Sequence, residues 1–183
     1  DVAATIGALG LALLVAIFLM YAVMAAQFES FIYPAIVLVT LPLGIIGVAI
    51  GLFITGFPVS VTVLIGIIMI AGIVVNNAII LIDYINILRG RGIARDEAIK
   101  TAGKTRLRPI FMTVATAVLG YVPLAFGIGA GSDFYQPMAI SVAFGLTMST
   151  VLTLIVIPVL YSITDDLGEW VKSLFKRGKK ADE

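Results

Sequence analysis

Two adjacent amides and a carboxylate interrupt an apolar stretch of this chain. Asn76, Asn77 and Asp83 lie in residues 72–83, Gly-Ile-Val-Val-Asn-Asn-Ala-Ile-Ile-Leu-Ile-Asp, within a run long enough to cross a bilayer. A polar group at membrane depth is costly, so it tends to face the interior of a helix bundle, where it serves a function or joins helices through hydrogen bonds. We therefore expect the chemistry of the chain to centre on this segment, with inter-helical hydrogen bonding as the simpler alternative.

Helical geometry places these three side chains on two different faces of the predicted helix. Asn76 and Asp83 are seven residues apart, almost two full turns, so they share one face, whereas Asn77 lies about 100° around the helix. Asp83 is expected near the inner end, with both amides roughly 10 Å deeper. An amide donates and accepts hydrogen bonds but does not release a proton at physiological pH. Asn76 and Asn77 can thus orient a proton carrier without being one.

A second polar pair lies on the segment that follows. Arg106 and Thr113 are also seven residues apart, so a helix would place them on one face that could meet the Asn76 side. An isolated arginine near a membrane surface is usually an anchor whose charged end reaches the water. Its pairing with an intramembrane amide cluster makes Arg106, together with Thr113, a candidate for the same site.

The composition points to a membrane protein. Hydrophobic residues make up 61% of the chain and charged residues only 13%, far from the usual soluble balance. The chain has neither Cys nor His, so it lacks thiolate chemistry, disulfides and the commonest proton carrier and metal ligand; no metal site is expected. The first residues, Asp1-Val2-Ala3, include no initiator Met and no basic stretch, which predicts the start of a piece of a longer sequence rather than a signal peptide.

Apolar runs separated by turn residues predict an all-α, polytopic membrane bundle. Each run meets the need for about 20 apolar residues per span. Pro34 and Pro109 are expected near helix starts, whereas Pro42, Pro123 and Pro158 fall inside spans and are expected to kink them. The five predicted spans are 6–27, 31–53, 61–88, 109–129 and 138–163.

The distribution of positive charge predicts the orientation. All twelve Lys and Arg lie in residues 89–108 and 172–180, and with five spans both segments fall on the same side of the membrane. Loops rich in Lys and Arg are cytoplasmic. The C-terminus is therefore expected inside and the N-terminus outside.

Two segments at the basic side are amphipathic. In residues 89–108 and again in residues 164–183, apolar residues recur at helical spacing among charged ones. We expect short helices lying along the inner surface in contact with membrane lipid, the second being a basic cytoplasmic tail after a bundle formed by residues 1–163. Simple interfacial anchoring accounts for both. The two stripes are Ile93, Ala94, Ala98, Ile99 and Ala102, and Leu167, Trp170, Val171, Leu174 and Phe175.

Small residues are also arranged in a row. Gly44, Gly47 and Gly51 follow one another along the second span. Glycines at such positions let two helix backbones approach closely, which is how helices associate where lipid offers no hydrophobic driving force. Ordinary close helix packing is the expected role.

Several motifs in order resemble those of one transporter family. They are Gln27-Phe28-Glu29-Ser30-Phe31, Pro42-Leu43-Gly44, Gly72-Ile73-Val74-Val75-Asn76-Asn77-Ala78-Ile79 and Arg106-Leu107-Arg108-Pro109-Ile110. Over roughly residues 20–160 the chain resembles the resistance-nodulation-division (RND) transporters, and more narrowly the hydrophobe/amphiphile efflux branch, which comprises proton-driven multidrug pumps of the bacterial inner membrane. The match corresponds to the second-half transmembrane repeat without its first helix.

The resemblance implies roles for the polar residues. In the family, a pair of aspartates in the first membrane half takes up and releases protons, and Asn76 and Asn77 occupy the equivalent positions of the second half. Arg106 and Thr113 match positions that complete the proton relay. Asp83 is a candidate accessory residue because of its position near the inner end of the span, not because of a family match. Many relatives have a lysine where Asn76 stands, so here an amide replaces a charge. The energy source implied is the proton motive force, with no cofactor.

The resemblance also implies partners that this chain does not contain. These are the N-terminal half and the periplasmic domains of the same transporter, in a homotrimeric parent; no nucleic-acid partner is expected. The chain would then be part of a secondary active transporter rather than an enzyme, and would not transport anything alone. Self-association through the face meant for the missing half is a further hypothesis, motivated by the inward amides and the glycine row.

Two alternatives remain open. One is a lipid- or protein-export member of the same superfamily, which shares the fold. The other is a non-transporting membrane scaffold subunit encoded as a short chain. The motifs at residues 27–31 and 76–78 favour the drug-efflux branch without deciding the cargo.

Overall fold

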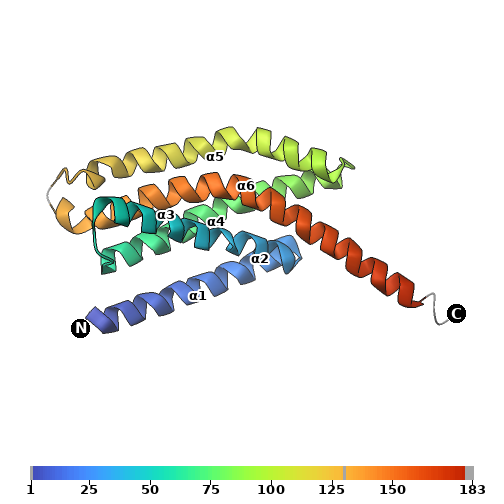
Figure 1. Ribbon diagram of the computed structural model, residues 1–183, viewed down its shortest axis with the longest axis horizontal. Helices are drawn as coiled ribbons and strands as arrows, with labels where there is room; N and C mark the ends of the chain where they lie inside the picture. Colours follow the sequence, from blue (N-terminus) through green and yellow to red (C-terminus); the bar gives the residue numbers. More distant parts are fainter. Residues whose placement is uncertain (1, 130, 180–183) are drawn as a thin grey trace.

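The described residues form a bundle of α-helices and contain no strand. The computed structural model describes the backbone of residues 2–129 and 131–179, and the side chains of residues 3–129 and 131–167. Five long segments are apolar enough to cross a membrane, which confirms the predicted all-α membrane bundle. In chain order the helices are α1 (Val2–Phe28), α2 (Ile32–Leu38), α3 (Thr40–Thr55), α4 (Val61–Gly90), α5 (Arg95–Ala125) and α6 (Ser132–Lys179) (Figure 1).

The second predicted span is divided into α2 and α3. The helix is interrupted at Val39, three residues before Pro42, because a proline has no N–H to continue the ladder and its ring clashes with the preceding turn. The buried hydroxyl of Thr40 donates to the Val37 carbonyl oxygen at 2.6 Å and so supplies a hydrogen bond at the break. The chain turns after α3 at Gly56, whose φ of 74° lies in the left-handed region that suits glycine.

The fourth span differs from the prediction. The sequence predicted a short surface helix followed by a span that starts at Pro109. This prediction is wrong, because α5 runs without interruption from Arg95 to Ala125 and contains Pro109. Its first turn carries two acidic residues, which interact favourably with the partial positive charge at a helix N-terminus. Ala98 and Ala102 are fully buried, so the apolar stripe of this segment packs against the bundle instead of lying along a membrane surface.

The last span is longer than predicted at both ends. Helix α6 begins at Ser132, whose hydroxyl donates to the Gly127 carbonyl oxygen at 2.8 Å, and its backbone continues helically to Lys179. In Figure 1 the final part of α6 extends beyond the other helices. Leu167 is exposed; the other four residues of the predicted tail stripe, 170–175, lie outside the described side chains. The division of the chain into a bundle and a tail at residue 164 stays a prediction.

Helix α4 is the centre of the bundle. It contacts every other helix, whereas α1 contacts only α2 and α4 within the described part of the chain. One core cluster packs Leu81 and Ile85 of α4 against Tyr161 of α6. The other packs Val74 of α4 against Leu146 of α6. Since α4 also carries the polar segment 72–83, the packing of α4 decides which way each polar side chain faces.

Helices α3 and α6 approach each other closely at glycines. A Cβ atom on Gly47 would lie 2.7 Å from both the Phe144 carbonyl oxygen and the Met148 Cβ. The same Cβ on Gly47 would lie 3.0 Å from the Cα atom of Gly145 on the facing helix. These distances leave no room for a side chain, so the glycine row does what the sequence predicted and brings two backbones together.

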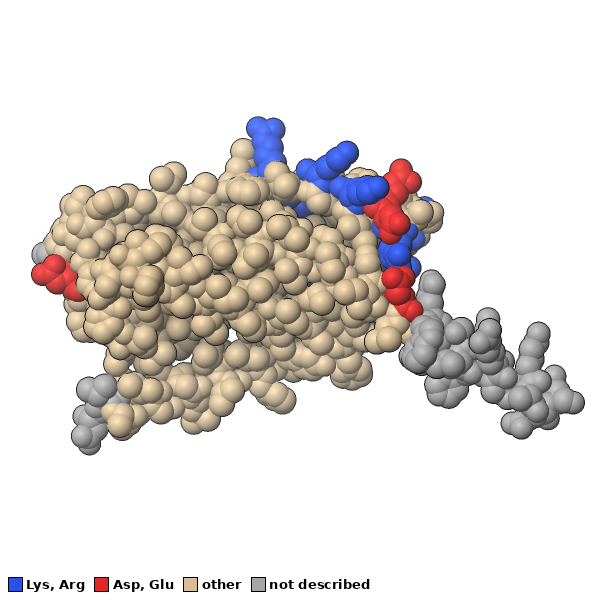
Figure 2. Space-filling model, viewed as in Figure 1, with Lys and Arg blue, Asp and Glu red and all other residues tan. Residues whose placement is uncertain are grey.

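Positive side chains gather toward one end of the molecule. Figure 2 shows Lys and Arg over the region formed by the α4–α5 turn and the first half of α5, which we call the basic end. The opposite end of the described chain carries no Lys or Arg. The described residues of the basic end are Arg89, Arg91, Arg95, Lys100, Lys104, Arg106 and Arg108.

Substituting Gly47 tests the close packing. We expect Gly47→Ala to lower the stability of the chain by about 1–3 kcal/mol, because the added methyl group must displace the α6 backbone. Thermal unfolding in detergent measures the loss. Gly10→Ala is the matched control, since a Cβ there meets nothing within 4 Å, and it should cause no loss. Equal stability of the two variants would contradict the close α3–α6 contact.

Candidate functional site

The polar segment of α4 has an open face and a buried face. Asn76 and Asp83 are both exposed and share the open face, as the seven-residue spacing predicts. Asn77 is only 6% exposed and turns toward the interior of the bundle, where it lines a small cavity together with Ile110 of α5 and Thr153 of α6. The structure therefore separates the two amides: Asn76 is available to a partner outside the chain, and Asn77 is not.

Arg106 is held against α4. Its guanidinium carbon lies 4.6 Å from the centre of the Tyr84 ring, within the range of a cation–π interaction. Its Nε atom is buried and has no hydrogen-bond partner among the described residues. A guanidinium carries five N–H donors, so Arg106 retains donor capacity at a position next to the open face of α4. This placement differs from that of an anchor reaching freely into water.

Thr113 lies at the level of the amides. Helices α4 and α5 are joined by a short turn and pack against each other in opposite directions. Since Arg106 lies beside Tyr84, Thr113, seven residues further and roughly 10 Å along the axis, comes level with residues near Asn77. The Thr113 side chain is exposed, and its hydroxyl donates to the Pro109 carbonyl oxygen at 3.0 Å.

The chemistry available on this surface is limited to hydrogen bonding and fixed charge. The amide of Asn76 and the hydroxyl of Thr113 can donate and accept, and Arg106 is permanently positive. None of these three groups can take up a proton in a transport cycle. A proton carrier in contact with them has to be a carboxylate, either Asp83 on the same face or one supplied from outside the chain.

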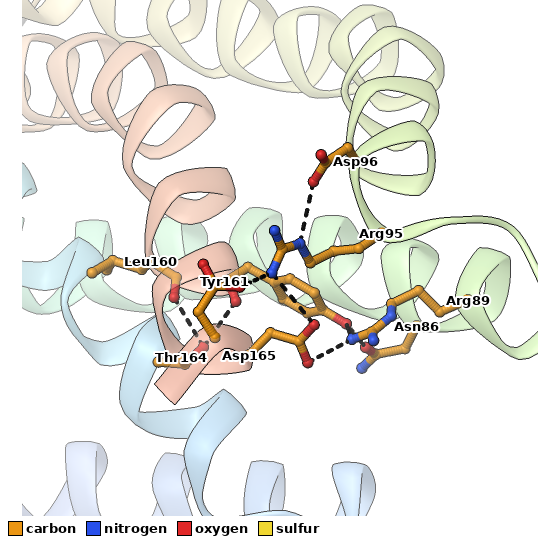
Figure 3. Close-up of polar contacts among 9 residues, drawn as sticks. Asn86, Arg89, Arg95, Asp96, Leu160, Tyr161, Thr164 and Asp165 are labelled. Carbon is orange, nitrogen blue, oxygen red and sulfur yellow. Dashed lines mark hydrogen bonds and ion pairs between the residues drawn. The ribbon is translucent and has the colours of Figure 1, made fainter. Parts of the chain in front are cut away.

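A second polar cluster joins the helices at the basic end (Figure 3). Arg89 of α4 donates to Asp165 Oδ1 at 2.9 Å and to the Tyr161 hydroxyl at 3.3 Å, both on α6. The Tyr161 hydroxyl in turn donates to Asn86 Oδ1 at 2.7 Å. We call these residues, together with Arg95, the Arg89–Asp165 cluster.

Two further contacts extend the Arg89–Asp165 cluster to other helices. Arg95, at the start of α5, forms an ion pair with Asp166 and lies 3.8 Å from Asp165 Oδ2. Tyr33 of α2 stacks on Tyr161, with ring centres 5.6 Å apart and planes 11° from parallel. The cluster therefore fixes four helices relative to one another at the end of the bundle where α6 leaves it.

Sequence reasoning missed the Arg89–Asp165 cluster. The basic segment 89–108 indicated only the orientation of the chain, and residue 165 falls within the predicted tail. Arg89 and Asp165 are 76 residues apart, so no local spacing reveals that they meet. The one available signal was the presence of two adjacent aspartates, 165 and 166, at the end of a span that leads to the basic side.

Removing the shared carboxylate tests what the Arg89–Asp165 cluster contributes. We expect Asp165→Asn to lower stability by about 1 kcal/mol, because Arg89 loses an ionic partner that is partly shielded from solvent. Thermal unfolding at low and high salt measures it, and the loss should shrink as salt rises. Glu97→Gln, an exposed acid with no ion pair among the described residues, is the control. A salt-independent loss, or an equal effect in the control, would contradict an electrostatic role.

Comparison with known proteins places the chain in a family. The model of the AcrB/AcrD/AcrF family matches residues 3–165. The chain is 39% identical over 164 residues to swarming motility protein SwrC of Bacillus subtilis (strain 168), a match that covers 89% of this chain and 16% of SwrC.

Solved structures show the same similarity. Crystal form II of a heavy metal efflux pump has a TM-score of 0.77 and 32% identity, covering 86% of this chain and 15% of that one. Crystal form I of a heavy metal efflux pump has a TM-score of 0.67 and 36% identity, covering 72% of this chain and 14% of that one. The chain thus spans about one-sixth of the length of these relatives.

The family model covers nearly the whole bundle, including α4, α5 and the polar residues they carry. The expected membership is confirmed, and the five apolar helices fit a multi-pass membrane protein. The chain belongs to the AcrB/AcrD/AcrF family of RND transporters.

Proposed function

We propose that this chain is the C-terminal transmembrane portion of a proton-driven efflux transporter and supplies one side of its proton-relay interface. The observation that carries the proposal is the unused donor capacity of Arg106, whose buried Nε has no partner among the described residues. An N–H donor that is shielded from solvent and has no acceptor is unfavourable. An acceptor on a neighbouring segment of the transporter, facing the open side of α4, would remove this cost.

The acceptor that fits is a carboxylate from the N-terminal membrane half. Arg106 would favour its ionised form, and Asn76 and Thr113 would hydrogen-bond it. When that carboxylate takes up a proton, its attraction to Arg106 is lost and the contact between the two halves changes. Because Asn76 is neutral, it stabilises the ionised form less than a lysine would at the same position.

The same proposal gives a role to Asp83 and an orientation to the chain in the membrane. Asp83, on the open face and closer to the basic end than Asn76, is a candidate accessory residue for protons entering from the cytoplasm. The basic end is cytoplasmic and the N-terminus of the chain lies outside. The transporter would reside in the bacterial inner membrane as a homotrimer, and the N-terminal half and periplasmic domains of the same transporter would complete it.

The cargo has two candidates. The motifs at residues 27–31 and 76–78 favour drug efflux by resemblance. The similarity to a heavy metal efflux pump, at a TM-score of 0.77, favours metal ions as the second candidate. Cells producing the full-length transporter distinguish them, since tolerance would rise either to amphiphilic drugs or to metal ions.

Substituting Arg106 tests the relay. In the full-length transporter we expect Arg106→Ala to reduce tolerance to that of cells without the transporter, because the proton-binding carboxylate loses its positive neighbour. Growth against a series of cargo concentrations measures the effect. Asn76→Ala should be milder, since an amide contributes a hydrogen bond worth about 1 kcal/mol rather than a charge.

Arg108→Ala is the matched control, because Arg108 is an exposed basic residue two positions away. It should retain tolerance, and all three variants should reach the membrane in equal amounts by immunoblot. Near-normal tolerance in Arg106→Ala would remove Arg106 from the relay.

A further inference from the structure

A small cavity lies behind the open face, between α4, α5 and α6. Its volume is about 10 Å³, close to the minimum of roughly 10–15 Å³ that one water molecule requires. No charged side chain contributes to its wall, so the cavity suits a neutral ligand rather than an ion. The lining residues are Val74, Asn77, Ile110, Thr150, Thr153 and Leu154.

Two of the lining side chains have unsatisfied polar atoms. Asn77 Nδ2 and Thr153 Oγ1 are buried and have no hydrogen-bond partner among the described residues. The two residues are only 6% and 5% exposed. Since Asn77 is on α4 and Thr153 on α6, the two groups face the cavity from different helices. Buried polar groups in native proteins nearly always have a partner, either in the protein or as ordered water.

A third polar side chain completes the wall. The Thr150 hydroxyl donates to the Leu146 carbonyl oxygen of its own helix at 2.7 Å. This bond uses its hydrogen but leaves oxygen lone pairs free to accept. The cavity therefore offers one amide donor, one hydroxyl that both donates and accepts, and one hydroxyl acceptor. A buried water typically makes about three hydrogen bonds, and these three groups match that number.

We propose that Asn77, Thr150 and Thr153 bind a single buried water molecule that links α4 to α6. The water accepts a hydrogen bond from Asn77 Nδ2 and donates to the Thr150 hydroxyl oxygen. Its third bond is with the Thr153 hydroxyl. Asn77 is thereby a positioning residue: its hydrogen bond fixes the rotation of α4, which in turn presents Asn76 on the open face. This inference does not depend on the cargo or on proton coupling.

A double-mutant cycle tests whether the water is bound, because the single substitutions should change the unfolding temperature in opposite directions with and without it. The variants are Asn77→Leu, Thr153→Val and the two combined, in the full chain in lipid nanodiscs. With the water bound, each single substitution should lower the unfolding temperature by roughly 2–4 °C, because the remaining partners are left unsatisfied. The combined variant should recover most of the loss. If no water is bound, each single substitution removes an unsatisfied group and raises the unfolding temperature, which would overturn the proposal.

Thr147→Val is the matched control for removing a hydroxyl from α6. Thr147 is exposed, and its hydroxyl donates to the Ala143 carbonyl oxygen at 2.7 Å, as Thr150 does within its own turn. When Thr147→Val is combined with Asn77→Leu, the two changes in unfolding temperature should simply add, without coupling. Coupling of the same size as for Thr153→Val would mean that the cycle reports a general property of α6, and would also overturn the proposal.

Radiolytic labelling separates a bridging water from a direct Asn77–Thr153 hydrogen bond. Brief X-ray radiolysis converts bound water into hydroxyl radicals, which abstract hydrogen from the adjacent side chain; dissolved O2 then adds to the carbon radical, and mass spectrometry detects the oxidised residue. Ile110, which lines the cavity and is 5% exposed, should be labelled, whereas Ile82, which is fully buried elsewhere in the core, should not. Labelling at Ile110 should disappear in the combined variant. Energetic coupling without labelling at Ile110 would indicate a direct Asn77–Thr153 hydrogen bond and would overturn the proposal. The labelling of the unmodified chain remains a valid test even if a variant fails to fold.

Discussion

Polar groups at membrane depth must find partners, and this requirement organises the molecule. The helical backbone satisfies itself, and most hydroxyls in the spans donate to a carbonyl oxygen one turn earlier, as Thr113 and Thr150 do. The exceptions are therefore informative. Arg106 Nε and Asn77 Nδ2 are buried without a partner among the described residues, one beside the open face of α4 and one behind it. Ser149 Oγ has the same status, and no contact in the structure explains it.

The fold holds α4 so that its two polar sides remain distinct. Glycines bring α3 and α6 into backbone contact, and α4 packs against both of these helices. At the basic end, the Arg89–Asp165 cluster fixes α4, α5 and α6 together. This support leaves Asn76 and Asp83 exposed while Asn77 faces inward. A helix free to rotate by one residue would exchange the roles of the two amides, so the rigidity of the surroundings matters as much as the amides themselves.

Local rules predicted a large part of this arrangement. Apolar runs predicted the five spans, and helical spacing correctly placed Asn76 and Asp83 on one face. Those rules failed where tertiary contacts outweigh local signals. Pro109 is usually read as a helix start, but α5 continues through it because Ala98 and Ala102 are buried against the bundle. The same limitation hid the pairing of Arg89 with Asp165 and the cavity between Asn77 and Thr153, since residues distant in sequence form both. Spacing alone also could not tell which of the two amides faces outward.

The central claim is that the open face of α4, with Asn76 and the adjacent Arg106, confronts an acidic group from another segment of the transporter. The most direct measurement is the distance from Asn76 Nδ2 and from the Arg106 guanidinium to the nearest carboxylate in an experimental structure of the full-length protein in lipid. The account predicts a carboxylate oxygen within hydrogen-bonding distance, about 2.7–3.2 Å, of at least one of these donors. A structure in which Asn76 contacts only acyl chains, with no carboxylate near Arg106, would contradict it.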